Sequence, residues 1–229
     1  MRKERFTVEG IPALLWGEPS RHLYVYVHGK MSSKETAEGF ARLAGERGMQ
    51  TLSFDLPGHG ERTDNANPDF FHGMRDLNTV ADYAFGRWEH LSLYACSLGA
   101  YFSLQAFSER PFERALFQSP IVDMEFLVKR MMEWFGVTEE ELKAKGIIDT
   151  PLETMRWEEY RYILTHPTER WTIPTAILFG GRDNLQSREV MDGFSRRFGA
   201  RLTVSPCSEH PFMGEGDGQI VEKWLKESM

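Results

Sequence analysis

The stretch Leu91-Ser-Leu-Tyr-Ala-Cys-Ser-Leu-Gly-Ala100 joins two kinds of local sequence at a single serine. Its first four residues have the composition of a buried strand, and an apolar helical run follows from Ala100 to Phe107. Between them, Ala95-Cys-Ser-Leu-Gly99 has the form small-x-Ser-x-Gly, which is typical of a sharp strand-to-helix turn. Such a turn has no room for large side chains two residues before and after the serine, and it lifts the hydroxyl clear of the sheet. The pattern therefore predicts that Ser97 is a nucleophile.

Strand-like and helix-like segments alternate on both sides of this turn. The run Leu23-Tyr-Val-Tyr-Val27 has the continuous apolar composition of a strand that is buried on both faces. Strands alternating with helices indicate βαβ units, so the sequence predicts an α/β fold with a mostly parallel, doubly wound sheet. Ser32-x-x-Glu35 is interpreted as a capping box that opens a helix reaching about Arg47. The expected strands are 6–8, 13–16, 23–27, 51–54, 91–94, 115–117, 175–179 and 201–204.

His210 is the candidate base among the seven histidines. A serine hydroxyl is a poor nucleophile until a neighbouring base takes its proton, and that base is usually a histidine. His210 stands in Ser205-Pro-Cys-Ser-Glu-His-Pro-Phe212, between the last expected strand and the closing helix. A lone histidine in such a loop would ordinarily be a surface residue, but the serine turn upstream favours the catalytic interpretation.

The base also needs a carboxylate to fix its tautomer, and two aspartates are candidates. Asp183 ends Phe179-Gly-Gly-Arg-Asp183, which has the form of a strand, a glycine turn and an acid. Asp123 follows the strand that ends at Gln118 and is the alternative. Asp183 is the preferred acid, although an aspartate there could also serve only as a turn residue or a helix cap.

An acyl-transfer site also needs N–H donors for the oxyanion that forms during the reaction. The amide of Leu98 lies at the start of the helix after Ser97, where N–H groups point outward. The second donor is expected from the loop after an earlier strand. There Gly29 allows close approach of the backbone, and the amide of Lys30 is the candidate.

The segment between about Ile121 and Trp171 interrupts the alternation, since it reads as three helices without a strand. Thr138-x-x-Glu141 is expected to cap the second helix and Thr150-Pro151-x-Glu153 the third. An all-helical insert is either a lid over a site or packing for a sheet edge. Its place between the candidate nucleophile and acid favours a lid. We therefore predict a core domain of residues 1–120 and 172–229 with a helical cap insertion of residues 121–171.

The whole chain resembles the α/β-hydrolase fold family. Matching pieces occur in the family's order: His28-Gly29 after a strand, Asp55-Leu-Pro-Gly-His-Gly60, the Ser97 turn, then Asp183 and His210. The resemblance implies an eight-stranded, mostly parallel sheet with a helical cap. It also implies that the Asp55 loop is structural, and it disfavours dehalogenase and epoxide hydrolase chemistry, because those relatives carry aspartate in place of Ser97.

These features predict a serine hydrolase that cleaves carboxylic esters with an apolar acyl or aryl group. The insert is rich in methionine and aromatic residues, which suit an apolar pocket with adaptable walls. Thioester, lactone, C–C or amide hydrolysis and acyl transfer share the same catalytic residues and stay open as alternatives, as does a non-catalytic binding module. The residues expected to bind substrate are Lys30, Met31, Met131 and Trp134.

Composition excludes several other classes of protein. The net charge is −7 with scattered basic residues, which argues against a nucleic-acid partner. No apolar run is long enough for a membrane span, and no signal peptide is visible at the N-terminus, so a cytoplasmic location is expected. The two cysteines have no metal-binding spacing, and His59 and Glu61 lack a third ligand, so neither metal nor cofactor is expected. The sequence does not predict the oligomeric state.

Overall fold

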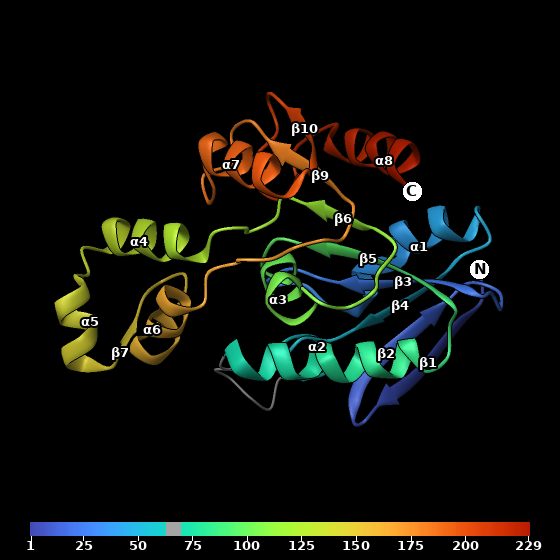
Figure 1. Ribbon diagram of the computed structural model, residues 1–229, viewed down its shortest axis with the longest axis horizontal. Coiled ribbons are helices and arrows are strands. Elements are labelled where there is room, and N and C mark those ends of the chain that lie inside the picture. The colour runs from blue at the N-terminus through green and yellow to red at the C-terminus, as the bar shows by residue number, and fades with distance from the viewer. Residues whose placement is uncertain (63–69) are drawn as a thin grey trace.

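An eight-stranded sheet with the order β1-β2-β4-β3-β5-β6-β9-β10 forms the centre of the computed structural model, which describes residues 1–62 and 70–229 (Figure 1). Pairings from β4 through β10 are parallel, and β1 and β2 are antiparallel to their neighbours. The predicted α/β class and mostly parallel sheet are therefore confirmed. The strands are β1 (Lys3–Val8), β2 (Ile11–Trp16), β3 (His22–Val27), β4 (Gln50–Phe54), β5 (His90–Cys96), β6 (Ala115–Gln118), β9 (Thr175–Gly180) and β10 (Arg201–Ser205).

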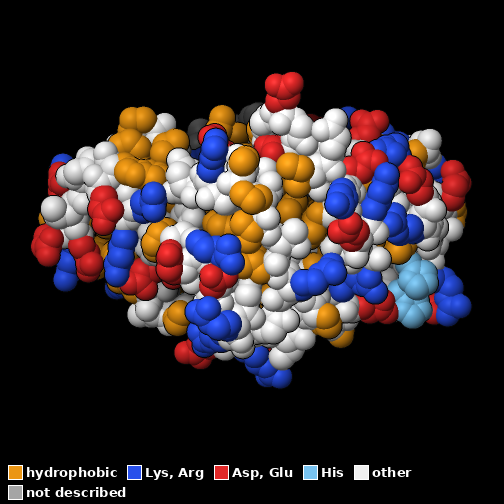
Figure 2. Space-filling model, turned by 90° about the horizontal axis from the view of Figure 1, so that it is seen from above, with side chains coloured by type: hydrophobic (Ala, Val, Ile, Leu, Met, Phe, Trp, Pro, Cys, Tyr) orange, Lys and Arg blue, Asp and Glu red, His pale blue; other side chains and the backbone are white. Residues whose placement is uncertain are grey.

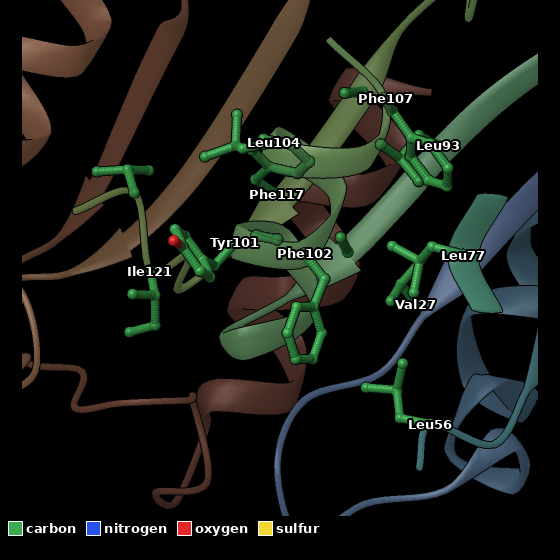
Figure 3. Close-up of a cluster of buried hydrophobic side chains, with 14 of the residues drawn as sticks. Val27, Leu56, Leu77, Leu93, Tyr101, Phe102, Leu104, Phe107, Phe117 and Ile121 are labelled. Carbon is green, nitrogen blue, oxygen red and sulfur yellow. The ribbon is translucent and has the colours of Figure 1, made fainter. Parts of the chain in front are cut away.

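Helices cover both faces of the sheet because the central strands are apolar on both sides. Successive side chains of a strand point to opposite faces. In β3, Val25 packs in a cluster with side chains of α2 (Phe70–Phe85), α3 (Leu98–Ala106) and α7 (Arg188–Phe198), whereas Tyr24 packs with α1 (Glu38–Gly45) and α8 (Asp217–Ser228). Figure 3 shows the first cluster, in which Phe102 and Leu104 of α3 lie among side chains from the strands and from α2.

The predicted capping box at Ser32 is wrong. The chain forms a short 3₁₀ turn, η1 (Lys34–Ala37), before α1, and no side-chain cap bonds to its N-terminus. The hydroxyl of Ser32 donates to the Thr36 hydroxyl at 2.9 Å. The amide of Lys34 donates instead to the Asp55 carboxylate at 2.8 Å, so a charged acceptor from the end of β4 replaces the local cap.

The segment 121–171 lies at one end of the molecule, away from α1 and α8 (Figure 1). It contains a two-stranded hairpin that the sequence analysis did not predict. The expected third helix is present, but its predicted start at Thr150 is wrong, because Thr150 accepts a hydrogen bond from the Glu153 amide and closes the hairpin turn, and the helix begins at Trp157. The elements are α4 (Met124–Phe135), α5 (Glu139–Lys145), β7 (Ile147–Asp149), β8 (Thr154–Arg156) and α6 (Trp157–Thr165).

The short hairpin explains the error in physical terms. A threonine followed three residues later by glutamate can cap a helix or close a turn with equal local hydrogen bonding. Here Asp149 and Thr154 pair across the turn, and the helix begins only at Trp157. Among the described residues, every helix is too short or too polar to cross a membrane.

Candidate active site

Ser97 stands at the junction of β5 and α3 in a backbone conformation that few non-glycine residues adopt. Its φ is 51° and its ψ is −120°, outside the regions that are relaxed for an L-residue. Two residues later, a Cβ atom on Gly99 would lie 2.4 Å from the carbonyl oxygen of His28. The turn therefore closes against the loop after β3, as the small residue in the sequence pattern predicts.

A continuous hydrogen-bonded chain links Ser97 to His210 and Asp183. The Ser97 Oγ lies 2.8 Å from His210 Nε2, and His210 Nδ1 lies 2.8 Å from Asp183 Oδ2. A carboxylate can only accept, so Nδ1 carries the ring proton and Nε2 is left to accept from the serine hydroxyl. The Asp183 side chain is completely buried and that of His210 is 9 % exposed, which shields both groups from water.

Asp183 is held in place by the loop that follows β9. Its second oxygen, Oδ1, accepts hydrogen bonds from the amides of Leu185 at 2.8 Å and Gln186 at 3.1 Å. The turn before it approaches the histidine loop so closely that a Cβ on Gly180 would lie 2.6 Å from the carbonyl oxygen of Ser208. Glycine is therefore needed at this position for the loop that carries Asp183 to meet the loop that carries His210.

We expect Gly180→Ala to lower kcat by about 100-fold, since displacing a catalytic group by roughly 1 Å costs that much. The new methyl group would push Ser208, and with it the histidine loop, away from Asp183. Steady-state kinetics measures the loss. Gly193→Ala is the matched control: it lies in α7 with nothing within 4 Å of the added methyl group, so kcat should not change. An unchanged kcat for Gly180→Ala would contradict the argument.

Asp123, the alternative acid, has a different set of partners. It is the N-cap of α4, where its Oδ1 accepts from the Phe126 amide at 2.9 Å. Its own amide donates to the side chain of Gln186 at 2.9 Å. Of the two candidate acids, the structure brings Asp183, and not Asp123, into hydrogen-bonding contact with His210.

Two residues that the sequence analysis missed support the histidine loop. Gln118, at the end of β6, donates from Nε2 to the carbonyl oxygen of Pro211 at 2.9 Å. Asp217 is buried at the start of α8 and accepts from the Ser208 hydroxyl at 2.6 Å and the Gly214 amide at 2.8 Å. Gln118 is a polar residue at the end of the strand next to β5, and this position was the signal that could have identified it. The sequence has no comparable signal for Asp217.

The loop after β3 contacts Ser97 directly. A Cβ on Gly29 would lie 3.1 Å from the Cβ of Ser97, which places the following Lys30 beside the serine. The ammonium group of Lys30 donates to the carbonyl oxygen of Leu152 at 2.6 Å and pairs with the Glu153 carboxylate. The side chain thus ties the core to the β7–β8 turn.

His28 anchors this loop as a buried, neutral side chain. Its Nδ1–H donates to the Gly29 carbonyl at 2.7 Å, and its Nε2 accepts from the Leu56 amide at 3.1 Å. Burial lowers the pKa of His28 from 6.5 to about 4.

This shift predicts a loss of stability in mild acid. In the unfolded chain His28 becomes protonated below pH 6.5, whereas in the folded chain it becomes protonated only below about pH 4. The free energy of unfolding therefore falls as pH falls through that window. The expected loss is about 3 kcal/mol. Urea unfolding at pH 7 and pH 4.5 measures it, with His28→Gln as the variant that lacks this step. Equal pH dependence in both proteins would contradict the prediction.

The Asp55 loop holds the framework behind the site. Asp55 is completely buried, and its carboxylate accepts from the ammonium group of Lys34 at 2.6 Å and from the Glu61 amide at 3.0 Å. Lys34 is itself buried. Burial alone would lower the pKa of Lys34, but hydrogen bonds to Asp55, Glu61 and Glu35 outweigh it and raise the pKa.

A pocket of about 620 Å³ opens beside Ser97. The four residues predicted to bind substrate all line it, with Met131 buried, Trp134 partly exposed and Met31 almost fully exposed. The segment 121–171 supplies much of the wall. The apolar lining of the pocket includes residues of α3, α4, β8 and α6, among them Phe102, Met124, Leu127, Val128, Met131, Met155, Tyr160 and Ile163.

Cys96 precedes Ser97 but is a poor competitor as a nucleophile. Burial, with a smaller contribution from the charge of Asp183, raises the pKa of the Cys96 thiol to about 12. The thiol is therefore protonated at neutral pH, and the protonated form is unreactive.

Solved structures with the same arrangement of strands and helices cover nearly the whole chain. Est1E from Butyrivibrio proteoclasticus, described with bound ferulic acid, superimposes with a TM-score of 0.78 at 18% identity, over 98% of this chain and 96% of that one. The α/β hydrolase domain-containing protein 10 from mouse gives 0.75 at 14% identity, over 99% and 98%. The chain has the α/β-hydrolase fold.

An esterase from Pyrococcus furiosus shares the α/β-hydrolase fold with a TM-score of 0.68 at 16% identity, over 100% of this chain and 91% of that one. No protein-family model matches the sequence, and no curated protein matches it either. The α/β-hydrolase fold predicted from the order of the short motifs is thus confirmed by structure, where overall sequence similarity is too low to detect it.

Proposed function

We propose that the protein is a serine hydrolase that cleaves carboxylic esters, with Ser97 as nucleophile, His210 as base and Asp183 as the orienting acid. The observation that carries this proposal is the unbroken chain of hydrogen bonds from Asp183 through His210 to Ser97, at 2.8 Å each, beside a pocket. A serine hydroxyl bonded to a buried imidazole with an oriented partner is the arrangement that activates serine for attack.

The reaction follows from these contacts. His210 Nε2 takes the proton of Ser97 as Oγ attacks the acyl carbonyl carbon, and Asp183 stabilises the imidazolium that forms. The amides of Leu98 and Lys30 are the proposed donors to the oxyanion. As the tetrahedral intermediate collapses, the proton passes from His210 to the departing alcohol. Water then attacks the acyl-enzyme with the same base and releases the acid.

The pocket favours esters with an apolar acyl or aryl group. Its wall is mainly methionine, leucine and aromatic side chains, and methionine adapts to different shapes. Two of the similar structures are described as an esterase and as Est1E with ferulic acid bound, an aromatic acid. In this proposal the segment 121–171 acts as the lid, since it supplies much of the pocket wall beside Ser97.

Labelling with a fluorophosphonate probe tests the chemistry without knowledge of the substrate. The wild-type protein should gain the mass of one adduct on Ser97, located by peptide mapping, and His210→Ala should gain none. Absence of labelling in folded wild-type protein would overturn the proposal and favour a binding module.

A substrate panel then separates the alternative reactions. Esters, thioesters and amides of the same aromatic and medium-chain acids should be compared by kcat/KM. The proposal expects the highest values for esters and a fall for short, polar acyl groups. A preference for thioesters or amides would keep the serine mechanism and change the substrate class.

A further inference from the structure

Two histidines and one glutamate meet at the amino ends of the central strands, whereas Ser97 follows the carboxyl end of β5. His22 begins β3 and His90 begins β5, and the two are direct register partners in the parallel pairing of these strands. Their rings stack with centroids 4.3 Å apart and planes 12° apart. Glu113, just before β6, reaches His90, with its Oε1 2.5 Å from His90 Nδ1. The residues come from three segments that the sheet fixes side by side.

The cluster is open to solvent and has unused ligand atoms. His22 and Glu113 are exposed and His90 is half-buried. Within the described part of the chain, no hydrogen bond is formed by the ring nitrogens of His22. Figure 2 shows histidine side chains gathered at one end of the molecular surface, next to both basic and acidic groups. Arg21, which precedes His22 in the chain, is already paired with Glu89 and so offers little repulsion to a cation.

We propose that His22, His90 and Glu113 form a binding site for a divalent transition-metal ion of the Zn²⁺ class. Two imidazoles and a carboxylate are a donor set suited to Zn²⁺, with a water molecule as the fourth ligand. One ligand atom from each residue lies within 4.8 Å of the others. Tetrahedral coordination at about 2.0–2.1 Å requires the atoms to close by roughly 1.5 Å, which rotation of the exposed His22 and Glu113 side chains supplies.

The site is structural in this proposal, because it lies at the amino ends of β3 and β5 while Ser97 follows the carboxyl end of β5. A bound ion would cross-link β3, β5 and the segment entering β6. It would therefore stabilise the folded state by mass action without touching the hydrolytic residues. The proposal does not depend on the hydrolase activity, and its readouts are binding and stability.

Calorimetric titration of untagged protein with zinc chloride at pH 7.5 tests the site. We expect one equivalent to bind, and at 100 times Kd the Tm should rise by roughly 5–10 °C. His22→Ala and Glu113→Gln should each weaken binding at least tenfold and remove the Tm shift. The glutamine variant keeps a hydrogen-bonding group next to His90, so it separates loss of a ligand from loss of fold.

His166→Ala is the matched control, because His166 is an exposed histidine at the C-terminal end of α6 that stacks on Tyr162 and lies outside the cluster. It should bind zinc as the wild type does. Wild-type protein that fails to bind zinc would overturn the proposal. Equal binding by wild type, His22→Ala and Glu113→Gln would also overturn it, since the ion would then lie elsewhere.

Discussion

The Ser97→Ala variant is expected to lose about 10⁶-fold in kcat, the scale seen when a serine nucleophile is removed from such a triad. Among the described residues, only the Ser97 hydroxyl lies in hydrogen-bonding contact with His210 Nε2. Alanine has no hydroxyl proton to transfer and no oxygen to attack the ester. Ester hydrolysis under single-turnover and steady-state conditions measures the loss. The free energy of unfolding should change by no more than about 1 kcal/mol, because one hydrogen bond is removed.

Ser97→Gly is the informative companion variant. The positive φ of 51° at this position is costly for serine and for alanine alike, but glycine adopts it freely. We therefore expect Ser97→Gly to be inactive and yet more stable than Ser97→Ala by about 1–3 kcal/mol. A kcat of Ser97→Ala close to that of the wild type would show that Ser97 is not the nucleophile. Equal stability of the glycine and alanine variants would show that the turn stores no strain.

The Asp183→Asn variant is expected to lower kcat by about 10⁴-fold. An asparagine at this position can donate its N–H₂ group to His210, which stabilises the tautomer with the proton on Nε2 and prevents that nitrogen from accepting the serine proton. The variant would also lack the completely buried negative charge of Asp183 that stabilises the imidazolium. Measurement of kcat at saturating ester concentration gives the effect, with KM expected to change little.

Asp123→Asn is the matched control for the acid. Its side chain caps α4 through the Phe126 amide, a contact that asparagine can also make. We expect less than a tenfold change in kcat, with a stability close to wild type. A larger loss of activity for Asp123→Asn than for Asp183→Asn would transfer the role of orienting acid to Asp123.

The fold and the candidate catalytic residues could be predicted from sequence because local chemistry restricts them strongly. A serine flanked by Ala95 and Gly99 at a strand-to-helix junction has few structural solutions, and the close approach at Gly99 shows why. Apolar runs such as 23–27 indicate strands buried on both faces without further information. The roles of Ser97, His210 and Asp183 in catalysis stay predictions, although the structure brings all three into contact.

Other features could not be predicted, because their local sequence patterns are compatible with more than one structure. The sequence around Ser32 predicted a helix cap, but the Lys34 amide donates a hydrogen bond to the carboxylate of Asp55, which is distant in the sequence. Thr150 looked like a helix start, but the pairing of β7 with β8 decided in favour of a turn. In both cases the local pattern allowed two structures: a hydrogen bond from a distant residue decided the first, and the pairing of two short neighbouring strands decided the second.

By itself the sequence determined the α/β class, the order along the chain of the eight strands of the main sheet and the strand-to-helix turn at Ser97, since periodicity and turn chemistry act over a few residues. Only the tertiary structure shows that Asp183, and not Asp123, contacts His210, because both follow neighbouring strands and packing sets which carboxylate reaches the histidine. It also brought His22, His90 and Glu113 together, since strand register places residues far apart in the chain side by side.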